Sequence, residues 1–381
     1  MLDRLVKIFT SLRLTVVLLA LGLILVFWGT LAQVNLGLYK AQNEYFRSFF
    51  IFWQPQGASW KLPIFPGGYL VGGLLLINLF AAHFRYYRTS WKKLGIAIIH
   101  IGIVMLLLGQ LLTDLLSVES HMHIRNGESK NYSEAGRSFE LAIVDTSDEK
   151  EDKVVAIAGH RLEKSGDIAH AELPFAVRVK KYLPNSELSQ NQAAGFEPVG
   201  STHGVGQNAW WRLLPHETEM EQRDIPSAVV ELVTPQGSLG AYLVSGYLSQ
   251  PQEITHNGRN YQIELRPERF YKPFSLHLIE FRHDRYPGTE IPKDFSSLVL
   301  LQRPDTGERR EVRIYMNNPL RYNGETYYQS SFDKDDQGTV LQVVHNPGWL
   351  TPYFACVLVA LGLCIQFGIH LAGFAAKRKA A

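Results

Sequence analysis

Four apolar runs divide this chain of 381 residues, and they constrain its fold more than any other feature of the sequence. Each run reaches the roughly 20 residues that an α-helix needs to cross a bilayer. We therefore predict transmembrane helices at about 14–34, 67–84, 94–116 and from 350 onward. The first run is too long for a cleaved signal peptide, so we expect a retained anchor. The predicted fold class is a polytopic α-helical membrane protein with four transmembrane helices.

Basic residues gather on one side of the predicted helices. The amino terminus, the turn between the second and third helices and the carboxyl-terminal tail together hold ten cations and one acid, Asp3. The cations are Arg4, Lys7, Arg13, Arg85, Arg88, Lys92, Lys93, Lys377, Arg378 and Lys379. Because segments rich in Lys and Arg stay in the cytoplasm, we expect a multi-pass protein of the inner (cytoplasmic) membrane with both termini in the cytoplasm.

The polar region 117–348, between the third and fourth helices, is then expected on the periplasmic side, and 349–381 is expected to hold the fourth helix and a basic tail. Short runs of β-branched and aromatic residues, such as "AVVELVTP" and "SSLVLLQRP", predict a mainly-β, sandwich-like domain. Turn signals separate the runs: "HNGR" from His256, "PDTG" from Pro304 and "YNGE" from Tyr322. Residues 186–211, rich in Gly, Ser and Asn, predict a long surface loop.

The segment 41–60 joins the first two predicted helices and is aromatic. Its first half is amphipathic, and Trp53 and Trp60 suit the headgroup level of a membrane. We predict an interfacial helix on the outer surface, ended by a turn at Pro55–Gly57, with membrane lipid as its partner. A simple aromatic belt is the alternative.

The predicted periplasmic domain is acidic and has no cysteine. It holds 25 Lys and Arg against 33 Asp and Glu, a net charge of −8, which favours a basic client. Cys356 and Cys364 lie in the fourth apolar run, and their spacing is not that of a metal or haem-attachment site, which indicates packing. No nucleophile elbow, phosphate-binding loop or CxxCH motif occurs, and we assign no catalytic residue.

Two histidines back onto apolar runs, in the stretch "HFRYYRTSWKKLGIAIIHIG" from His83 to Gly102. His100 follows Lys93 closely enough to lie about 10 Å into the third helix, at 1.5 Å per residue. An ionisable side chain at that depth normally faces a partner, and a neutral imidazole suits haem iron. His100 is therefore our candidate metal-binding axial ligand, with an interhelical hydrogen bond as the alternative.

His83 lies two residues from Arg85, so its ring can reach the cytoplasmic headgroups. We predict an interfacial side chain that lines the cofactor-binding site beside His100. The alternative is a haem held by both His83 and His100, which would be a b-type cofactor.

Other histidines offer further alternatives. His121, His123 and His345 flank the third and fourth helices and could converge on a metal ion at the outer surface, although such spacing is common on exposed strands. His370, near the end of the fourth helix, is expected to be interfacial.

Several motifs, taken in order, resemble the ResB family, also called CcsB, over essentially the whole chain. "SLRLTVVLLALGLILVFWGT" is similar to the family's first span, and "IIHIGIVMLLLG" followed by "MHIRNGES" is similar to its third. "MNNPLRYNGETYYQSSFD" and "VVHNPGWLTPYFACVLVALGL" resemble the exported domain and its return to the membrane. The family supplies a membrane subunit of the system II (Ccs) machinery of cytochrome c biogenesis.

The resemblance implies haem handling. Family members work with a CcsA (ResC) membrane subunit, whose WWD segment and external histidines hold haem for attachment to the CxxCH thiols of apocytochrome c. Haem b in transit is ligated by one membrane histidine from each subunit, and the residue that matches this ligand here is His100. This sequence has no WWD segment, so we expect a non-catalytic subunit of a cytochrome c haem lyase (holocytochrome c synthase) complex.

The resemblance also bears on partners. The exported domain has no thiol, so a separate thioredoxin-like reductant is expected to keep the client's cysteines reduced. No nucleic-acid partner is expected. Two other functions stay open: a b-type electron-transfer subunit with haem between His83 and His100, and a haem-free chaperone that holds apocytochrome.

The predicted topology can be tested with reporter fusions. An alkaline phosphatase fused near Asp305 is expected to be active, because its disulfides form only outside the cytoplasm, and one fused after Lys379 is expected to be inactive. The reverse pattern would show that the assigned orientation is wrong.

Overall fold

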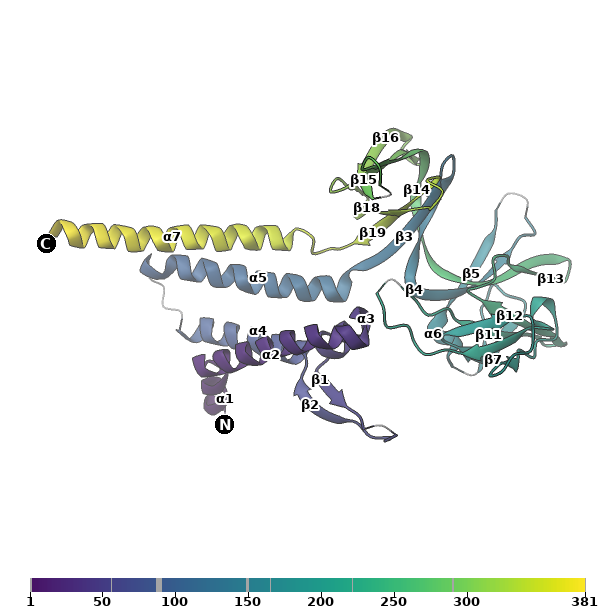
Figure 1. Cartoon of the computed structure of the whole chain (residues 1–381), viewed down its shortest axis with the longest axis horizontal. Coiled ribbons are helices and arrows are strands. Elements are labelled where there is room, and N and C mark those ends of the chain that lie inside the picture. Colours follow the sequence, from purple (N-terminus) through teal and green to yellow (C-terminus); the bar gives the residue numbers. More distant parts are fainter. Residues whose placement is uncertain are drawn as a thin grey trace. The chain divides into compact units, whose positions relative to one another are not determined.

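The computed structural model describes residues 2–55, 57–86, 91–148, 151–164, 166–220, 222–289 and 291–380. The chain forms two compact units, whose elements are labelled in Figure 1. The helical unit comprises Met1–Val118, Thr218–Met220 and Asn346–Ala381, and the β unit comprises Glu119–Glu217 and Glu221–His345. Apolar helices and a large, mainly-β domain were both predicted, and both are present.

Among the described residues, three helices are long and apolar enough to cross a membrane. They are α2 (Leu12–Leu36), α5 (Leu94–Leu116, extended by η2 at Trp91–Lys93) and α7 (Thr351–Ala380). The second predicted helix, at 67–84, is α4 (Gly68–Tyr86), whose apolar part, Gly68–His83, is shorter. Membrane helices are therefore confirmed, whereas their number of four stays a prediction. The unit also contains the short helices α1 (Leu2–Phe9) and α3 (Leu38–Ala41) and the π-helical turn η1 (Gln42–Phe46).

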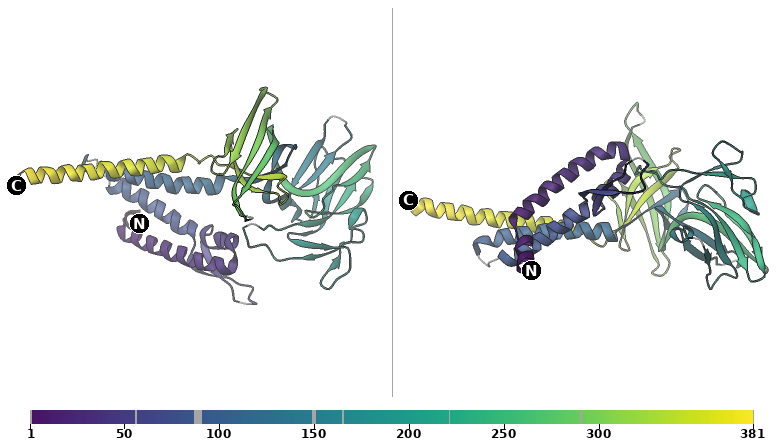
Figure 2. Two further views of the ribbon diagram at one scale, coloured as in Figure 1. Left: turned by 45° about the horizontal axis from the view of Figure 1, so that its top comes forward. Right: turned by 90° about the horizontal axis from the view of Figure 1, so that it is seen from below.

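Glycines bring α5 and α7 into close contact, and the two helices run side by side in Figure 1 and in both views of Figure 2. Gly95, Gly102 and Gly109 recur every seven residues on one face of α5. A Cβ at Gly102 would lie 2.6 Å from Cγ2 of Val359, and one at Gly95 would lie 2.5 Å from the carbonyl oxygen of Gly362. Since only hydrogen fits at these positions, the backbones approach as closely as small residues allow in membrane helix pairs.

The segment 41–60 differs from the predicted interfacial helix. Helical structure ends at Phe46, and β1 (Phe50–Trp53) then pairs antiparallel with β2 (Leu62–Pro66). Consecutive aromatic and β-branched residues suit a pleated strand, which places Ile51 in a small core against α2. The predicted helix is therefore wrong beyond Phe46. Large side chains on the hairpin stay exposed: Phe50, Phe52, Trp53 and Trp60.

Three sheets build the β unit. The largest has the order β16-β15-β14-β4-β3-β19-β18-β17, with β13 added to β14 and β5 to β4. Its strands are β3 (Val118–Arg125), β4 (Ser129–Asp145), β5 (Lys153–Ala158), β13 (Gln252–His256), β14 (Arg259–Arg285), β15 (Pro292–Arg303), β16 (Glu308–Tyr315), β17 (Leu320–Tyr322), β18 (Glu325–Phe332) and β19 (Gly338–His345).

The second sheet has the order β12-β11-β7-β6 and the third has the order β8-β10-β9. The second contains β6 (Gly166–Ile168), β7 (Ala176–Leu183), β11 (Ser227–Thr234) and β12 (Gly237–Ser245). The third contains β8 (Ser186–Ser189), β9 (Glu197–Pro198) and β10 (Trp210–Leu213). The short helices α6 (Gly159–Leu162) and η3 (Gly204–Gly206) complete the unit.

Two hydrophobic cores lie along the 27 residues of β14. Its first part, with Tyr261 and Ile263, packs with β4 and β5 against β7, β11 and β12, which makes the sandwich-like layer that the sequence predicts. Its second part, with Leu276 and Leu278, packs with β3, β15, β16, β18 and β19 around a separate core. Alternating apolar residues on one long strand thus serve both cores in turn.

The three turn predictions are confirmed. Asn257 and Asn323 have φ values of 51° and each precedes a glycine of positive φ, while Gly307 has a φ of 68°. These left-handed conformations favour asparagine and glycine, which is why the hairpins β13–β14, β15–β16 and β17–β18 form there.

The predicted surface loop at 186–211 is wrong in part. It contains β8, β9 and the start of β10, and Trp211 is 1% exposed in a core with Leu183 and Leu243. The free energy gained by burying the large Trp211 ring offsets the entropy lost when this segment, rich in Gly, Ser and Asn, becomes ordered.

The α5–α7 contact can be tested with matched substitutions. Gly102→Val is expected to destabilise the helical unit by about 1–3 kcal/mol, because the new side chain must displace Val359. Gly72→Val on α4 is the control, since a Cβ there meets nothing within 4 Å. Thermal unfolding of the detergent-solubilised chain should show a lower melting temperature for the first variant only. Equal melting temperatures would contradict the close packing.

Candidate functional site

Two polar contacts join α4 to α5, one towards each end of the helix pair. The ring centroids of His83 and His100 are 6.3 Å apart, with their planes at 40°. The Tyr69 hydroxyl donates a hydrogen bond of 2.5 Å to Oδ2 of Asp114. Tyr69 and His83 are 14 positions apart on α4, and His100 and Asp114 are 14 positions apart on α5. This spacing corresponds to about 21 Å along the helix axis and puts both residues of each helix on nearly the same face. The helices therefore meet in antiparallel register along these faces.

His100 has a defined tautomer. Its Nδ1 lies 2.7 Å from the carbonyl oxygen of Ile96, one turn earlier in α5. Because a carbonyl oxygen can only accept, this contact assigns the proton to Nδ1 and leaves the lone pair on Nε2. A backbone hydrogen bond of this kind orients a metal-ligating imidazole in many proteins. The half-buried His100 ring is thus held through Nδ1, an arrangement that suits a metal ligand binding through Nε2.

The contact between α5 and α7 sets the direction of His100. Gly102 faces α7, and each residue of an α-helix turns the side chain by about 100°. His100, two positions earlier, therefore points about 160° away from the α7 contact. Asp114 lies within about 40° of His100 by the same count. One face of α5 thus packs on α7, and the opposite face presents both polar residues.

His83 is half-buried beside His100, so the structure brings together the two candidate residues. The sequence predicts an interfacial side chain at this position, and Arg85, two residues later, is indeed exposed. Arg88, another cation of the predicted cytoplasmic turn, lies outside the described residues. Because His83 contacts His100, it belongs to the same candidate site, either as a lining side chain or as a second ligand.

The contact at the other end of α4 and α5 was not predicted. Arg47, just after η1, donates from Nε to Oδ1 of Asp114 at 2.8 Å, while Tyr69 donates to Oδ2. The Asp114 side chain is 14% exposed, so its charge is paired where an apolar helix would otherwise leave it poorly solvated. The sequence does show Asp114 as the single acid in the run 94–116, but no sequence pattern identifies Arg47 and Tyr69 as its partners.

The histidines at the ends of the third and fourth helices do not form a metal site. His123 pairs with Asp333 at 2.9 Å, and Nδ1 of His345 lies 3.2 Å from the carbonyl oxygen of Gly324. Among the residues that the structure describes, no group of three or more His, Cys, Asp or Glu is arranged to hold a metal ion. This alternative is therefore not supported.

The remaining candidates on α7 have other environments. His370 contacts Nε2 of Gln366 at 3.0 Å, on its own helix. Cys356 and Cys364 are exposed, so the packing predicted for them does not occur within this chain.

Comparison with known proteins connects the chain to a family. The model of the ResB-like family matches residues 251–339, which run from β13 into β19. Protein NrfI of Wolinella succinogenes is 28% identical over 300 residues, which are 76% of this chain and 29% of NrfI. The chain thus spans less than a third of the length of this relative. The resemblance to the ResB family, first recognised from motifs, is confirmed.

Proposed function

We propose that this chain is a haem-handling subunit of a system II cytochrome c biogenesis complex, in which His100 ligates haem b in transit across the membrane. The likeness to the ResB family and to NrfI supports the biogenesis role. The single observation that carries the ligand assignment is the hydrogen bond from His100 Nδ1 to Ile96, which leaves Nε2 free to bind iron. The chain acts as a non-catalytic part of the holocytochrome c synthase.

The haem iron takes its second axial ligand from the partner, a CcsA (ResC)-type subunit with a WWD segment. His100 lies on the face of α5 away from α7 and beside His83 of α4, so a helix of the partner that reaches it leaves the α5–α7 contact in place. Neighbouring helices pack about 8–10 Å apart, which leaves little room for a haem between adjacent helices of one hairpin. His83 then lines the site and shields the haem edge rather than ligating it.

The other partners follow from the same role. The β unit receives apocytochrome c, whose CxxCH cysteines are kept reduced by a separate thioredoxin-like protein. The basic segments favour a topology with both termini in the cytoplasm and the β unit in the periplasm, on the side where haem is attached.

A second candidate function has one specific observation in its favour. The 6.3 Å between the His83 and His100 rings is about the span of two metal–nitrogen bonds of about 2 Å each plus the two ring radii. A b-type electron-transfer subunit would hold a haem permanently in this way. The two candidates differ in whether His83 is a ligand.

Substitution of the two histidines separates these functions. His100→Gly is expected to abolish the haem absorbance of the purified complex, and added imidazole is expected to restore part of it by occupying the vacated position. His83→Ala should leave the spectrum nearly unchanged. His370→Ala, which removes a histidine from another apolar helix, is the matched control.

The opposite result is equally clear. If His83→Ala and His100→Gly remove haem to the same extent, and the chain purified alone holds a low-spin bis-imidazole haem, the electron-transfer function is correct.

A further inference from the structure

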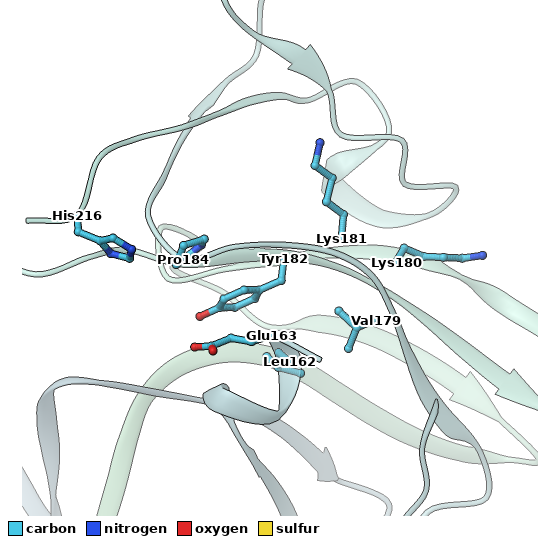
Figure 3. Close-up of a pocket in the computed structure, with 8 residues that line it drawn as sticks. All are labelled: Leu162, Glu163, Val179, Lys180, Lys181, Tyr182, Pro184 and His216. Carbon is cyan, nitrogen blue, oxygen red and sulfur yellow. The ribbon is translucent and has the colours of Figure 1, made fainter. Parts of the chain in front are cut away.

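A cleft in the β unit has no role in the function proposed so far. It lies where α6 approaches β7, and two adjoining cavities of about 410 Å³ and about 300 Å³ form it. Both cavities are lined by Glu163, Tyr182, Pro184 and His216. Figure 3 shows the Tyr182 ring and the Glu163 carboxylate on the same side of β7, with Lys181 pointing to the other side.

One wall of this cleft is an open strand edge. β7 pairs with β11 from Ala176 to Leu183, but β6 pairs only with Val177–Val179. Among the described residues, no strand covers Lys180–Leu183 on the β6 side. An open edge presents backbone N–H and C=O groups to which another extended chain can bond.

The opposite wall is held in a fixed position by buried hydrogen bonds. Asn185, 2% exposed, donates to the Pro215 carbonyl oxygen at 2.6 Å and accepts from the Ile225 N–H at 3.0 Å. Between these two points, Nδ1 of His216 lies 2.6 Å from Oδ2 of Asp224. The two ends of the loop that carries His216 are therefore held together beside the cleft.

The cations of the lining have partners within the chain, as does Arg137 in the smaller cavity. Lys180 is paired with Glu231 at 2.8 Å and Lys181 with Glu197, so neither lysine offers an unpaired charge to a ligand. In contrast, none of the described residues forms an ion pair with Glu163. Glu268, which lines the smaller cavity, likewise forms no ion pair with any described residue.

Tyr182, which lines both cavities, adds a hydrogen-bond donor. Burial, with a smaller contribution from the charges of Glu163 and Asp224, raises the pKa of the Tyr182 hydroxyl to about 12. The hydroxyl therefore keeps its proton throughout the physiological range and can donate to a peptide carbonyl.

We propose that this cleft binds an extended polypeptide segment with a basic side chain, which adds a strand to the open edge of β7 at Lys180–Leu183. Alternate residues of an extended chain lie about 7 Å apart on one face, which suits two adjoining cavities. The backbone bonds with β7, and the basic side chain lies against Glu163 and Glu268. The occupant is the unfolded client polypeptide, so this inference rests on the proposed function, and the net charge of −8 on region 117–348 has the matching sign.

Binding can be measured on the full chain in lipid nanodiscs by fluorescence anisotropy. The probes are two short fluorescein-labelled peptides of equal length, one alternating lysine with valine and one alternating glutamate with valine. The lysine peptide is expected to bind and the glutamate peptide is not. The double variant Glu163→Gln, Glu268→Gln is expected to bind the lysine peptide about tenfold more weakly.

A control of equal charge separates the cleft from general attraction to an acidic surface. Glu172 and Glu253 are exposed and line neither cavity, so Glu172→Gln, Glu253→Gln should bind the lysine peptide as the unchanged chain does. Hydrogen exchange should show new protection at Lys180–Leu183 when the lysine peptide is bound, and unlabelled haem-free cytochrome c should displace it.

Three results would overturn the proposal: equal affinity of the two double variants, binding without protection of Lys180–Leu183, or no competition by haem-free cytochrome c. These outcomes are independent of the haem spectrum. A chain that binds the peptide but no haem contradicts only the haem-handling function, and a chain that binds haem but no peptide contradicts only the cleft.

Discussion

The rotation of α5 is the constraint on which the candidate site depends. Gly95, Gly102 and Gly109 leave room for α7 on one face only, and a side chain at any of them would separate the two helices. Once that face is buried, His100 and Asp114 must point away from α7. His100 and Asp114 thus owe their direction to a packing contact built around three glycines.

His100 and Asp114, on the face of α5 that meets α4, have different hydrogen-bond partners. Asp114 has its two oxygens paired with Arg47 and Tyr69, so its charge is balanced within the chain. His100 bonds to its own backbone through one nitrogen and keeps the other as a lone pair. The half-buried ring thus keeps one nitrogen available for a ligand. The proposed ligand of that nitrogen is the haem iron.

How far the sequence predicted the structure depended on whether a signal was local. The helices α2, α5 and α7 and the Asn-Gly turns follow from contiguous residues. The ligand role of His100 rests on its depth in one apolar run and stays a prediction. The strand at Phe50–Trp53 was mistaken for helix because aromatic residues suit both an interface and a pleated strand. Trp211 was placed in a loop because its core comes from distant strands. The contacts of α4 with α5 depend on their register, which no local pattern specifies.

The most direct test of the central claim is to count the axial nitrogens that this chain supplies to the haem. The chain would be produced with histidine labelled by the heavy nitrogen isotope, assembled with an unlabelled WWD partner and haem, and examined by pulsed electron paramagnetic resonance in the ferric state. The account predicts one labelled and one unlabelled axial nitrogen, with the labelled one lost in His100→Gly. Two labelled axial nitrogens, or none, would contradict it.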